Sequence, residues 1–280
     1  MTERIIQTNG VEIATEAFGD PANPPMLLVM GAMASMLWWP AEFCERLAAR
    51  GFFVIRYDNR DTGLSTTSEL GKPDYSKDDM AEDALGILDA YGIGKAHVVG
   101  MSLGGMVAQI ATLDHPERVR SLTLISTEPI GVDNSHLPPM PEAYAEHGAR
   151  GADVDWSDRE QTIAYVAADM RMIASTAHPH DAAAARAFLD RDYDRARKFQ
   201  AGTNHFMIGG GEGRDIRALS VPLLVMHGES DPVFSVENGR LSAASVPGAE
   251  LLVIKGGGHE MHPADWEQII TAVGGHAGKH

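Results

Sequence analysis

The stretch that most constrains the fold is AHVVGMSLGG, residues 96–105. Apolar Val98 and Val99 lead directly into the pentapeptide GMSLG at 100–104, and a helical pattern of apolar residues follows it. A serine between two glycines at a strand–turn–helix junction is the pattern of a nucleophile elbow. The serine of such a turn has strained backbone angles, so larger side chains two positions away would clash. The stretch therefore predicts a strand, a sharp turn with Ser102 at its apex, and a helix.

Short apolar segments on both sides of this stretch alternate with helical patterns. Asn9-Gly10 between the first two segments indicates a β-hairpin. Strands that alternate with helices indicate a mostly parallel sheet covered by helices on both faces, an α/β fold. The predicted strands are 4–7, 11–17, 26–30, 52–57, 96–100, 119–125, 223–227 and 250–254, and the predicted helices are 38–50, 76–91, 103–114, 236–246 and 265–273.

The alternation stops between residues 128 and 220, where no clear strand pattern occurs. Three prolines near residue 140 mark a loop, and helices are predicted at 159–175, 181–190 and 195–202. We therefore expect an α/β core domain made of residues 1–127 and 221–280. A helical cap, residues 128–220, is inserted between two strands of its sheet.

Two further polar residues follow predicted strands in the part of the core beyond the insertion. Asp231 lies just after strand 223–227, and His259 lies just after strand 250–254. The carboxyl ends of parallel strands meet at one edge of a sheet, where open α/β sheets place their sites. An activated serine needs a base, and the base needs an orienting acid. Ser102, Asp231 and His259 occur in the chain order typical of a hydrolase triad.

Several other residues compete for the roles of acid and base. Glu128 follows strand 119–125, and Glu229 precedes Asp231 by two positions. Among the histidines, His262 lies at a predicted helix start, His227 ends a strand in the core, and His205 lies in the cap. Asp231 and His259 are preferred because they and Ser102 follow three separate strands to one edge of the sheet, in the chain order expected of a triad.

An oxyanion needs two backbone N–H donors. Leu103, the residue after the serine, supplies one, and the Gly31-Ala32 loop after strand 26–30 supplies the other through Ala32. Methionine and tryptophan residues near these loops and in the cap suggest a lipophilic substrate pocket. Its predicted lining residues are Met33, Trp38, Met207 and Met261.

Composition narrows the possible partners. With 23 basic and 39 acidic residues the net charge is −16, which disfavours nucleic acid. The only cysteine, Cys44, lies in an apolar helical stretch and is predicted to be a core residue. His178 and His180 are interpreted as surface residues, and no metal site or cofactor is expected. No apolar run approaches the roughly 18 residues of a membrane span, and MTERIIQTNG does not resemble a signal peptide. We expect a cytoplasmic protein that contacts no membrane, and the oligomeric state stays open.

These motifs together resemble the α/β-hydrolase superfamily along nearly the whole chain. The matching residues are Gly31-Ala32, the D-x-R-x-x-G-x-S pattern at 58–65, GMSLG at 100–104, Asp231-Pro232 and Gly258-His259. Stretches 28–31, 55–65 and 97–105 are similar to aclacinomycin methylesterase-like carboxylesterases. This resemblance implies a sheet of about eight strands, a helical cap, no cofactor, and ester hydrolysis through an acyl-enzyme. One difference is Met30, where many relatives have histidine.

The identity of residue 102 separates the classes within that superfamily. Aspartate there would indicate an epoxide hydrolase or haloalkane dehalogenase, whereas Ser102 indicates acyl transfer. We therefore predict a serine hydrolase that cleaves a carboxylic ester of a neutral, fairly apolar small molecule. The alternatives are a lactonase or enol-lactone hydrolase, a C–C bond hydrolase, a cofactor-free perhydrolase, and a non-catalytic ligand-binding homologue.

Overall fold

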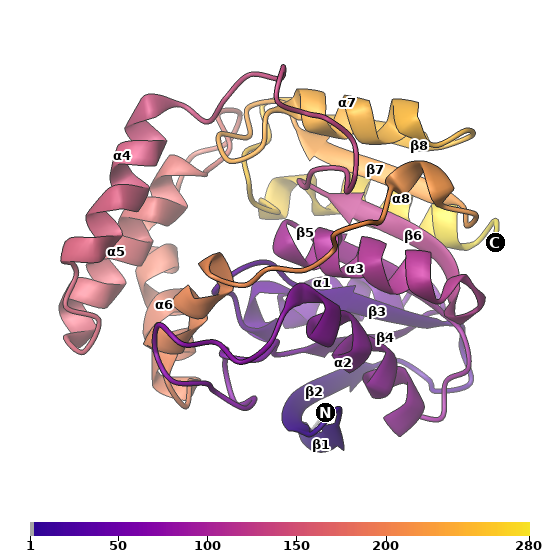
Figure 1. Ribbon diagram of the computed structural model, residues 1–280, viewed down its shortest axis with the longest axis horizontal. Coiled ribbons are helices and arrows are strands. Elements are labelled where there is room, and N and C mark those ends of the chain that lie inside the picture. The colour runs from indigo at the N-terminus through magenta and orange to yellow at the C-terminus, as the bar shows by residue number, and fades with distance from the viewer. Residues whose placement is uncertain (1–2) are drawn as a thin grey trace.

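A computed structural model describes residues 3–280, and an eight-stranded sheet forms its centre (Figure 1). The strand order is β1-β2-β4-β3-β5-β6-β7-β8. β1 and β2 pair antiparallel with their neighbours, and the other strands are parallel. The predicted α/β fold is confirmed. The strands are β1 Arg4–Thr8, β2 Val11–Phe18, β3 Pro25–Val29, β4 Phe53–Tyr57, β5 Ala96–Met101, β6 Val119–Ile125, β7 Leu223–Gly228 and β8 Glu250–Ile254.

The hairpin between β1 and β2 forms where the sequence predicts it. Asn9 and Gly10 both have positive φ, 45° and 76°, as a type I′ turn requires. The Asn9 side chain also donates a hydrogen bond to Asp83 at 3.1 Å, which ties the turn to a helix.

Helices cover both faces of the sheet and create two apolar cores. One core lies beneath α2 Lys77–Ala90, α3 Leu103–Asp114 and α7 Val236–Ser245. The other lies beneath α1 Ala41–Ala48 and α8 Trp266–Ala277. α1 is shorter than predicted, because a 3-10 turn over Met36–Trp38 and then Pro40 precede it. The burial of apolar residues on both sheet faces explains why the central strands are apolar throughout.

The chain between β6 and β7 forms helices and no strand. Figure 1 shows α4 Glu142–Arg150, α5 Arg159–Met172 and α6 Ala182–Arg195 standing together beside the sheet. The sequence did not predict α4, which is polar on average and buries only His147, so it shows no strong apolar stripe. The predicted helix at 195–202 is wrong: α6 continues to Arg195, the backbone turns extended at Ala196, and a 3-10 segment covers Phe199–Phe206.

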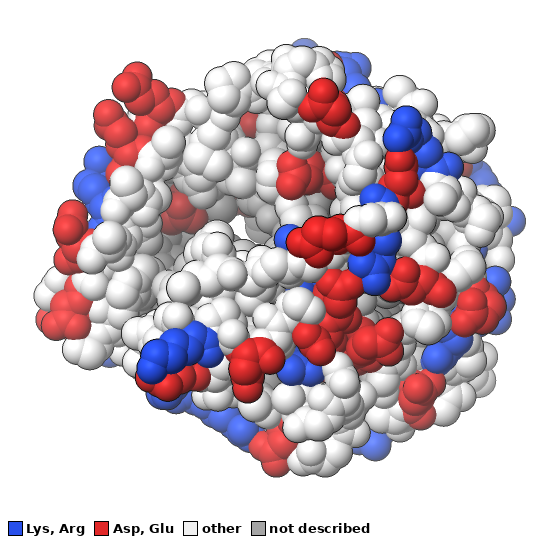
Figure 2. All heavy atoms as spheres, viewed as in Figure 1, with Lys and Arg blue, Asp and Glu red and all other residues white. Residues whose placement is uncertain are grey.

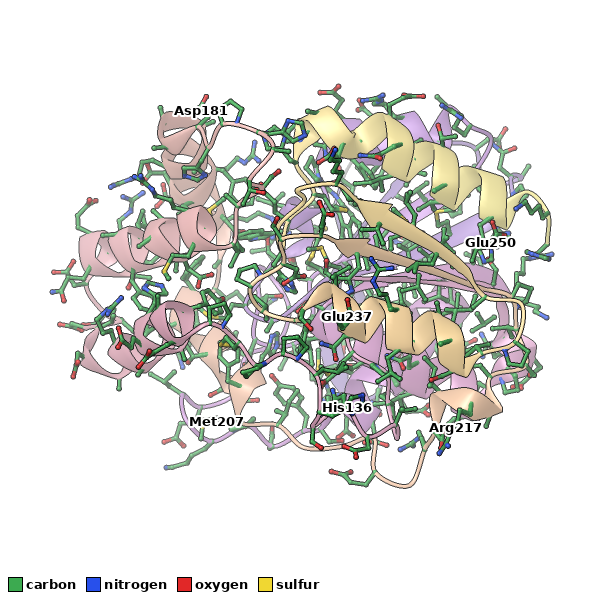
Figure 3. The ribbon with its side chains drawn as sticks, turned by 90° about the horizontal axis from the view of Figure 1, so that it is seen from above. His136, Asp181, Met207, Arg217, Glu237 and Glu250 are labelled. Atoms are coloured by element: carbon green, nitrogen blue, oxygen red, sulfur yellow. The ribbon has the colours of Figure 1, made fainter. Side chains whose placement is uncertain are left out.

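The first and last residues of this inserted segment pack against the α/β core, whereas the helices between them stand beside it. Ile130 and Val132 near its start, and Ile208 and Leu219 near its end, pack against the core under α2 and α3. Asp181, the residue before α6, lies at the outer limit of the helices in Figure 3.

The face shown in Figure 2 carries scattered acidic side chains interspersed with basic ones. Within residues 3–280, no helix combines the length and the apolar character that crossing a membrane requires. Met1 and Thr2 of the N-terminal stretch lie outside the described residues.

Candidate active site

Ser102 lies between β5 and α3 in the strained turn that the sequence predicts. Its backbone angles are φ 54° and ψ −124°, a region that costs a residue with a side chain strain energy. A Cβ at Gly100 would overlap the carbonyl oxygen of Gly104, and a Cβ at Gly104 would overlap the carbonyl oxygen of Val29. Both glycines are required because the turn brings strand and helix backbones into contact.

Asp231 lies at the carboxyl end of β7 and is almost completely buried. Its Oδ1 accepts hydrogen bonds from the N–H groups of Val233 and Phe234, at 2.8 and 3.0 Å. Its Oδ2 lies 2.8 Å from His259 Nδ1. Burial by itself would raise the pKa of Asp231, but His259 and His227 beside it outweigh burial and hold that pKa below its ordinary value. Asp231 is therefore an ionised partner for an imidazole.

His259 follows β8 in a loop that runs close to the end of α5. Its N–H donates to the carbonyl of Ile173 at 2.8 Å. A Cβ at Gly258 would overlap that same carbonyl oxygen, so only glycine fits before this histidine. The His259 side chain and Ser102 both line one cavity. The structure thus brings Ser102, Asp231 and His259 to the carboxyl edge of the sheet.

The competing histidines occupy other positions. His227 is fully buried behind Asp231, with Nε2 2.9 Å from the carbonyl of Phe234 and 3.4 Å from Asp231 Oδ2. His205 is also buried: its Nδ1 accepts from the N–H of Met33 and its Nε2 donates to the carbonyl of Arg60. These hydrogen bonds give both histidines structural contacts away from the serine.

The competing carboxylates also have other partners. Glu128 Oε2 accepts a hydrogen bond from the side chain of Asn134 at 2.7 Å, and Glu128 borders a separate small groove. Glu229 Oε2 accepts from the N–H of Gly256 at 3.0 Å. Neither carboxylate contacts His259 by hydrogen bond within residues 3–280.

The loop after β3 passes very close to the serine. A Cβ at Gly31 would lie 3.1 Å from Ser102 Cβ, so the backbone of Gly31-Ala32 approaches the elbow closely. Leu103 is the first residue of α3, so its N–H has no intrahelical partner. Ala32 and Ser102 both line the cavity.

Residues 58–65 hold this loop in place, a role that the sequence did not reveal. Asp58 accepts hydrogen bonds from the N–H groups of Met36 and Leu64, at 2.7 and 2.9 Å. The Asn59 side chain donates to the carbonyl of Met30 at 2.9 Å. The D-x-R-x-x-G-x-S pattern is the sequence signal for this support, although the pattern alone does not say which loop it contacts.

A cavity of about 700 Å³ opens in front of Ser102, and Figure 2 shows the molecule hollowed beside the helices of the inserted segment. Of the predicted pocket residues, Met33 and Trp38 line this cavity. Met207 and Met261 do not. Both Phe206 and Met207 are largely exposed, but only Phe206 borders the cavity, because neighbouring residues of a 3-10 turn point in different directions. Met207 lies at the edge of the molecule (Figure 3). Met261 packs instead against the core under α1 and α8.

The rest of the cavity wall comes mainly from side chains that sequence reasoning missed. Aromatic rings are prominent among them: Tyr144, Trp156, Tyr165, Phe199 and Phe206. Asp169 of α5 adds a carboxylate. Helix α5 has little apolar periodicity, so its sequence does not indicate which of its residues face inward.

Three side chains form the cluster best able to ligate a metal ion in the described chain. His178, His262 and Asp265 place their potential ligand atoms within 4.8 Å of one another. The His178 and His262 rings stack at 4.5 Å, and His178 Nε2 lies 3.2 Å from Asp265 Oδ1. Spacing along the chain does not reveal this cluster, because His262 lies far from His178 in the sequence.

Comparison with known proteins agrees with this architecture. The family model described as alpha/beta hydrolase fold matches residues 24–264. Rhodomycin D methylesterase from Streptomyces sp. (strain C5) is 32% identical over 99% of this chain and 98% of its own length. The esterase RhEst1 from Rhodococcus sp. ECU1013 has a similar structure, with a TM-score of 0.81 at 22% identity, over 99% of each chain. The enol-lactonase from Burkholderia xenovorans LB400 gives a TM-score of 0.77 at 22% identity, over 98% of this chain and 99% of its own.

The chain belongs to the α/β-hydrolase fold family. The resemblance to methylesterase-like carboxylesterases is confirmed by the full-length similarity to rhodomycin D methylesterase.

Proposed function

We propose that this chain hydrolyses a carboxylic ester of a neutral, fairly apolar small molecule through an acyl-enzyme on Ser102. The observation that carries the proposal is the 2.8 Å contact between His259 Nδ1 and Asp231 Oδ2, with His259 and the strained Ser102 on the wall of one cavity. The full-length methylesterase relatives support ester hydrolysis. The chain is accordingly a carboxylic ester hydrolase.

In the proposed reaction, Ser102 Oγ attacks the ester carbonyl while His259 Nε2 accepts the hydroxyl proton. Asp231 fixes the Nδ1–H tautomer of His259 and stabilises the imidazolium that forms. His259 then returns the proton to the leaving alcohol. Water, deprotonated by His259, attacks the acyl-enzyme and releases the acid with free Ser102.

The negative oxygen of each tetrahedral intermediate is stabilised by the N–H groups of Ala32 and Leu103. Support comes from the close approach of Gly31 to Ser102 and from the free N–H at the start of α3. Each donor of this kind is worth roughly 3–4 kcal/mol in the transition state.

Residues 128–220 serve as a cap over this site, on a core made of residues 1–127 and 221–280. The helices that face the cavity lie between Glu142 and Phe206, and their aromatic side chains form much of its wall. Such a wall suits an apolar acyl group. By analogy with the methylesterase relatives, the leaving alcohol is small.

The test of this function is Ser102→Ala. We expect hydrolysis of p-nitrophenyl acetate to fall by roughly 10⁴-fold or more, because the nucleophile is removed while the fold stays intact. A fluorophosphonate probe should label the wild type and not the variant.

Ser245→Ala is the matched control. Ser245 lies in α7, where its Oγ bonds the carbonyl of Leu241, so hydrolysis and labelling should match the wild type. Wild-type activity in a folded Ser102→Ala protein would contradict the proposed nucleophile.

A further inference from the structure

A carboxylate projects into the wall of an otherwise apolar and aromatic cavity. Asp169 of α5 is the only carboxylate among the lining residues of the described chain, and no lysine or arginine of that chain lines the cavity. Its side chain keeps 32% of its surface exposed. The structure therefore offers an acceptor of hydrogen bonds to whatever fills the cavity.

Aspartates that are almost completely buried have their hydrogen-bond partners within the chain. Asp58, Asp61, Asp83, Asp192 and Asp231 each accept two or more hydrogen bonds. Asp169 differs, because within residues 3–280 no N–H group donates to its carboxylate, and only the Tyr144 hydroxyl offers it a hydrogen bond. Polar groups with little access to solvent are normally paired, so this partly buried carboxylate on the cavity wall is free to accept a hydrogen bond from a molecule in the cavity.

The surroundings of Asp169 supply few donors. Tyr144 lines the cavity beside it, and His147 Nε2 lies 3.6 Å from Asp169 Oδ1, beyond hydrogen-bond distance. His147 is 4% exposed, its ring stacks on Tyr165 at 4.5 Å, and its Nε2 has no partner in the described chain. The Asp169 carboxylate and His147 Nε2 therefore lie next to each other, and both lack hydrogen-bond partners that they could accommodate.

Two pKa shifts describe the same environment. Burial raises the pKa of Asp169 above its ordinary value, and the Tyr144 hydroxyl and the His147 ring offset part of that rise. Burial and the nearby Asp169 raise the pKa of the Tyr144 phenol, so Tyr144 stays protonated.

We propose that Asp169 and Tyr144, with His147 behind them, form a polar subsite that binds a hydrogen-bond donor on the acyl part of the ester. The donor is a hydroxyl or an ammonium group, and an anionic group is disfavoured because no cation lines the cavity. The proposal rests on the proposed ester hydrolysis and adds a requirement to its substrate: an apolar body with one donor distant from the ester. The apolar walls strengthen this hydrogen bond by excluding water.

Matched substrates test the subsite. Methyl esters of phenylalkanoic acids, in a graded series of chain lengths, carry a para ethyl, hydroxymethyl or aminomethyl group. At the best chain length we expect kcat/KM for a donor-bearing ester to exceed that of its ethyl analogue by roughly tenfold or more. Asp169→Leu should bring this ratio close to one. Asp169→Asn, which keeps an oxygen acceptor without the charge, should lower the ammonium preference more than the hydroxyl preference.

Glu160→Leu is the matched control, because Glu160 lies on the same helix with its side chain 65% exposed and pairs with arginines outside the cavity. It should keep the wild-type ratios. Calorimetric binding of the corresponding N-methyl amides measures the same preference without turnover, so it tests the subsite even if ester hydrolysis fails. If Asp169→Leu does not fold, the kcat/KM ratios of the wild type and of Asp169→Asn test the subsite instead. Equal binding and kcat/KM for the three substituents, or ratios unchanged in Asp169→Leu, would overturn the proposal.

Discussion

Backbone strain in this protein concentrates where parallel strands end. Five non-glycine residues within 3–280 have positive φ, and Asn9 alone lies in a hairpin. The other four, Met33, Asp61, Ser102 and Ser126, follow the carboxyl ends of β3, β4, β5 and β6. Such strain persists only where surrounding contacts hold it. Its clustering marks the same sheet edge that carries Ser102 and His259.

Cys44 shows what burial does to a group that the mechanism does not use. Burial raises the pKa of the Cys44 thiol to about 12, whereas an unfolded cysteine titrates near 8.5. The thiol therefore stabilises the fold below about pH 8.5, and this contribution is lost as pH rises toward 12. Relative to Cys44→Ala, the wild type should lose roughly an additional 1.4 kcal/mol of unfolding free energy per pH unit in that range.

Urea denaturation of both proteins from pH 8 upward measures this difference, and the other titrating groups cancel in the subtraction. The cavity left by the alanine shifts the variant's curve by a constant amount. Curves that stay parallel through the range would show that Cys44 titrates normally in the folded protein.

At the scale of elements, the elbow depends on contact between α3 and β3. A Cβ at Gly104 would lie 2.6 Å from the carbonyl oxygen of Met30 and would overlap that of Val29. Because these are backbone atoms, they cannot move aside independently. Gly104→Ala should lower the unfolding free energy by about 3 kcal/mol. It should also reduce kcat, since it displaces the turn that carries Ser102.

The control for this substitution is Gly275→Ala in α8, where a Cβ meets no atom within 4 Å. There the helix propensity of alanine should stabilise the protein by roughly 0.5–1 kcal/mol. In chemical denaturation, Gly104→Ala should be less stable than the wild type and Gly275→Ala more stable. Ester hydrolysis should fall only in Gly104→Ala. Equal stability of both variants would argue against the packing of α3 on β3.

At the scale of the whole molecule, a buried ion pair and buried hydrogen bonds fix the helical segment to the core. Arg195 at the end of α6 contacts Asp58 Oδ2 at 2.8 Å and Glu3 Oε1 at 2.9 Å. The Asp58 side chain is completely buried. Asp192, one turn earlier, accepts from Ser35 Oγ and from Trp38 Nε1, at 2.5 and 3.0 Å. The same contacts therefore hold both α6 and the loop beside Ser102.

Removing the cation should leave Asp58 buried without compensation. Arg195→Met should cost about 3 kcal/mol of unfolding free energy, whereas Arg186→Met, which breaks exposed pairs with Glu160 and Asp190, should cost less than about 1 kcal/mol. Burial already raises the pKa of Asp58, and loss of Arg195 raises it further. A carboxyl group whose pKa is higher in the folded than in the unfolded state stabilises the folded protein when it is protonated. The loss of unfolding free energy in Arg195→Met should therefore become smaller as pH falls. A deficit equal to that of Arg186→Met would contradict this assignment.

Sequence patterns located the strands well because each strand is short, apolar and bounded by turn residues. All eight strands begin and end within two residues of the prediction, and α3 begins and ends as predicted. Sequence patterns are less informative in the inserted segment. Helix α4 is polar on average and buries a single residue, and the 3-10 segment Phe199–Phe206 turns with a different period from an α-helix. Met207 was therefore assigned to the cavity in place of Phe206.

The sequence by itself determined the sheet, the elbow at Ser102, and the positions of Asp231 and His259 beyond two later strands. These depend on local requirements: glycine where backbones touch, apolar residues in buried strands, and polar residues just beyond strand ends. Only the tertiary structure decided what faces Ser102. Asp169 comes from α5, whose sequence shows no apolar periodicity, and most aromatic rings of the cavity come from 3-10 segments and turns. Which of their residues point inward is fixed by contacts such as Asp192 with Ser35 and Arg195 with Asp58, between residues far apart in the chain.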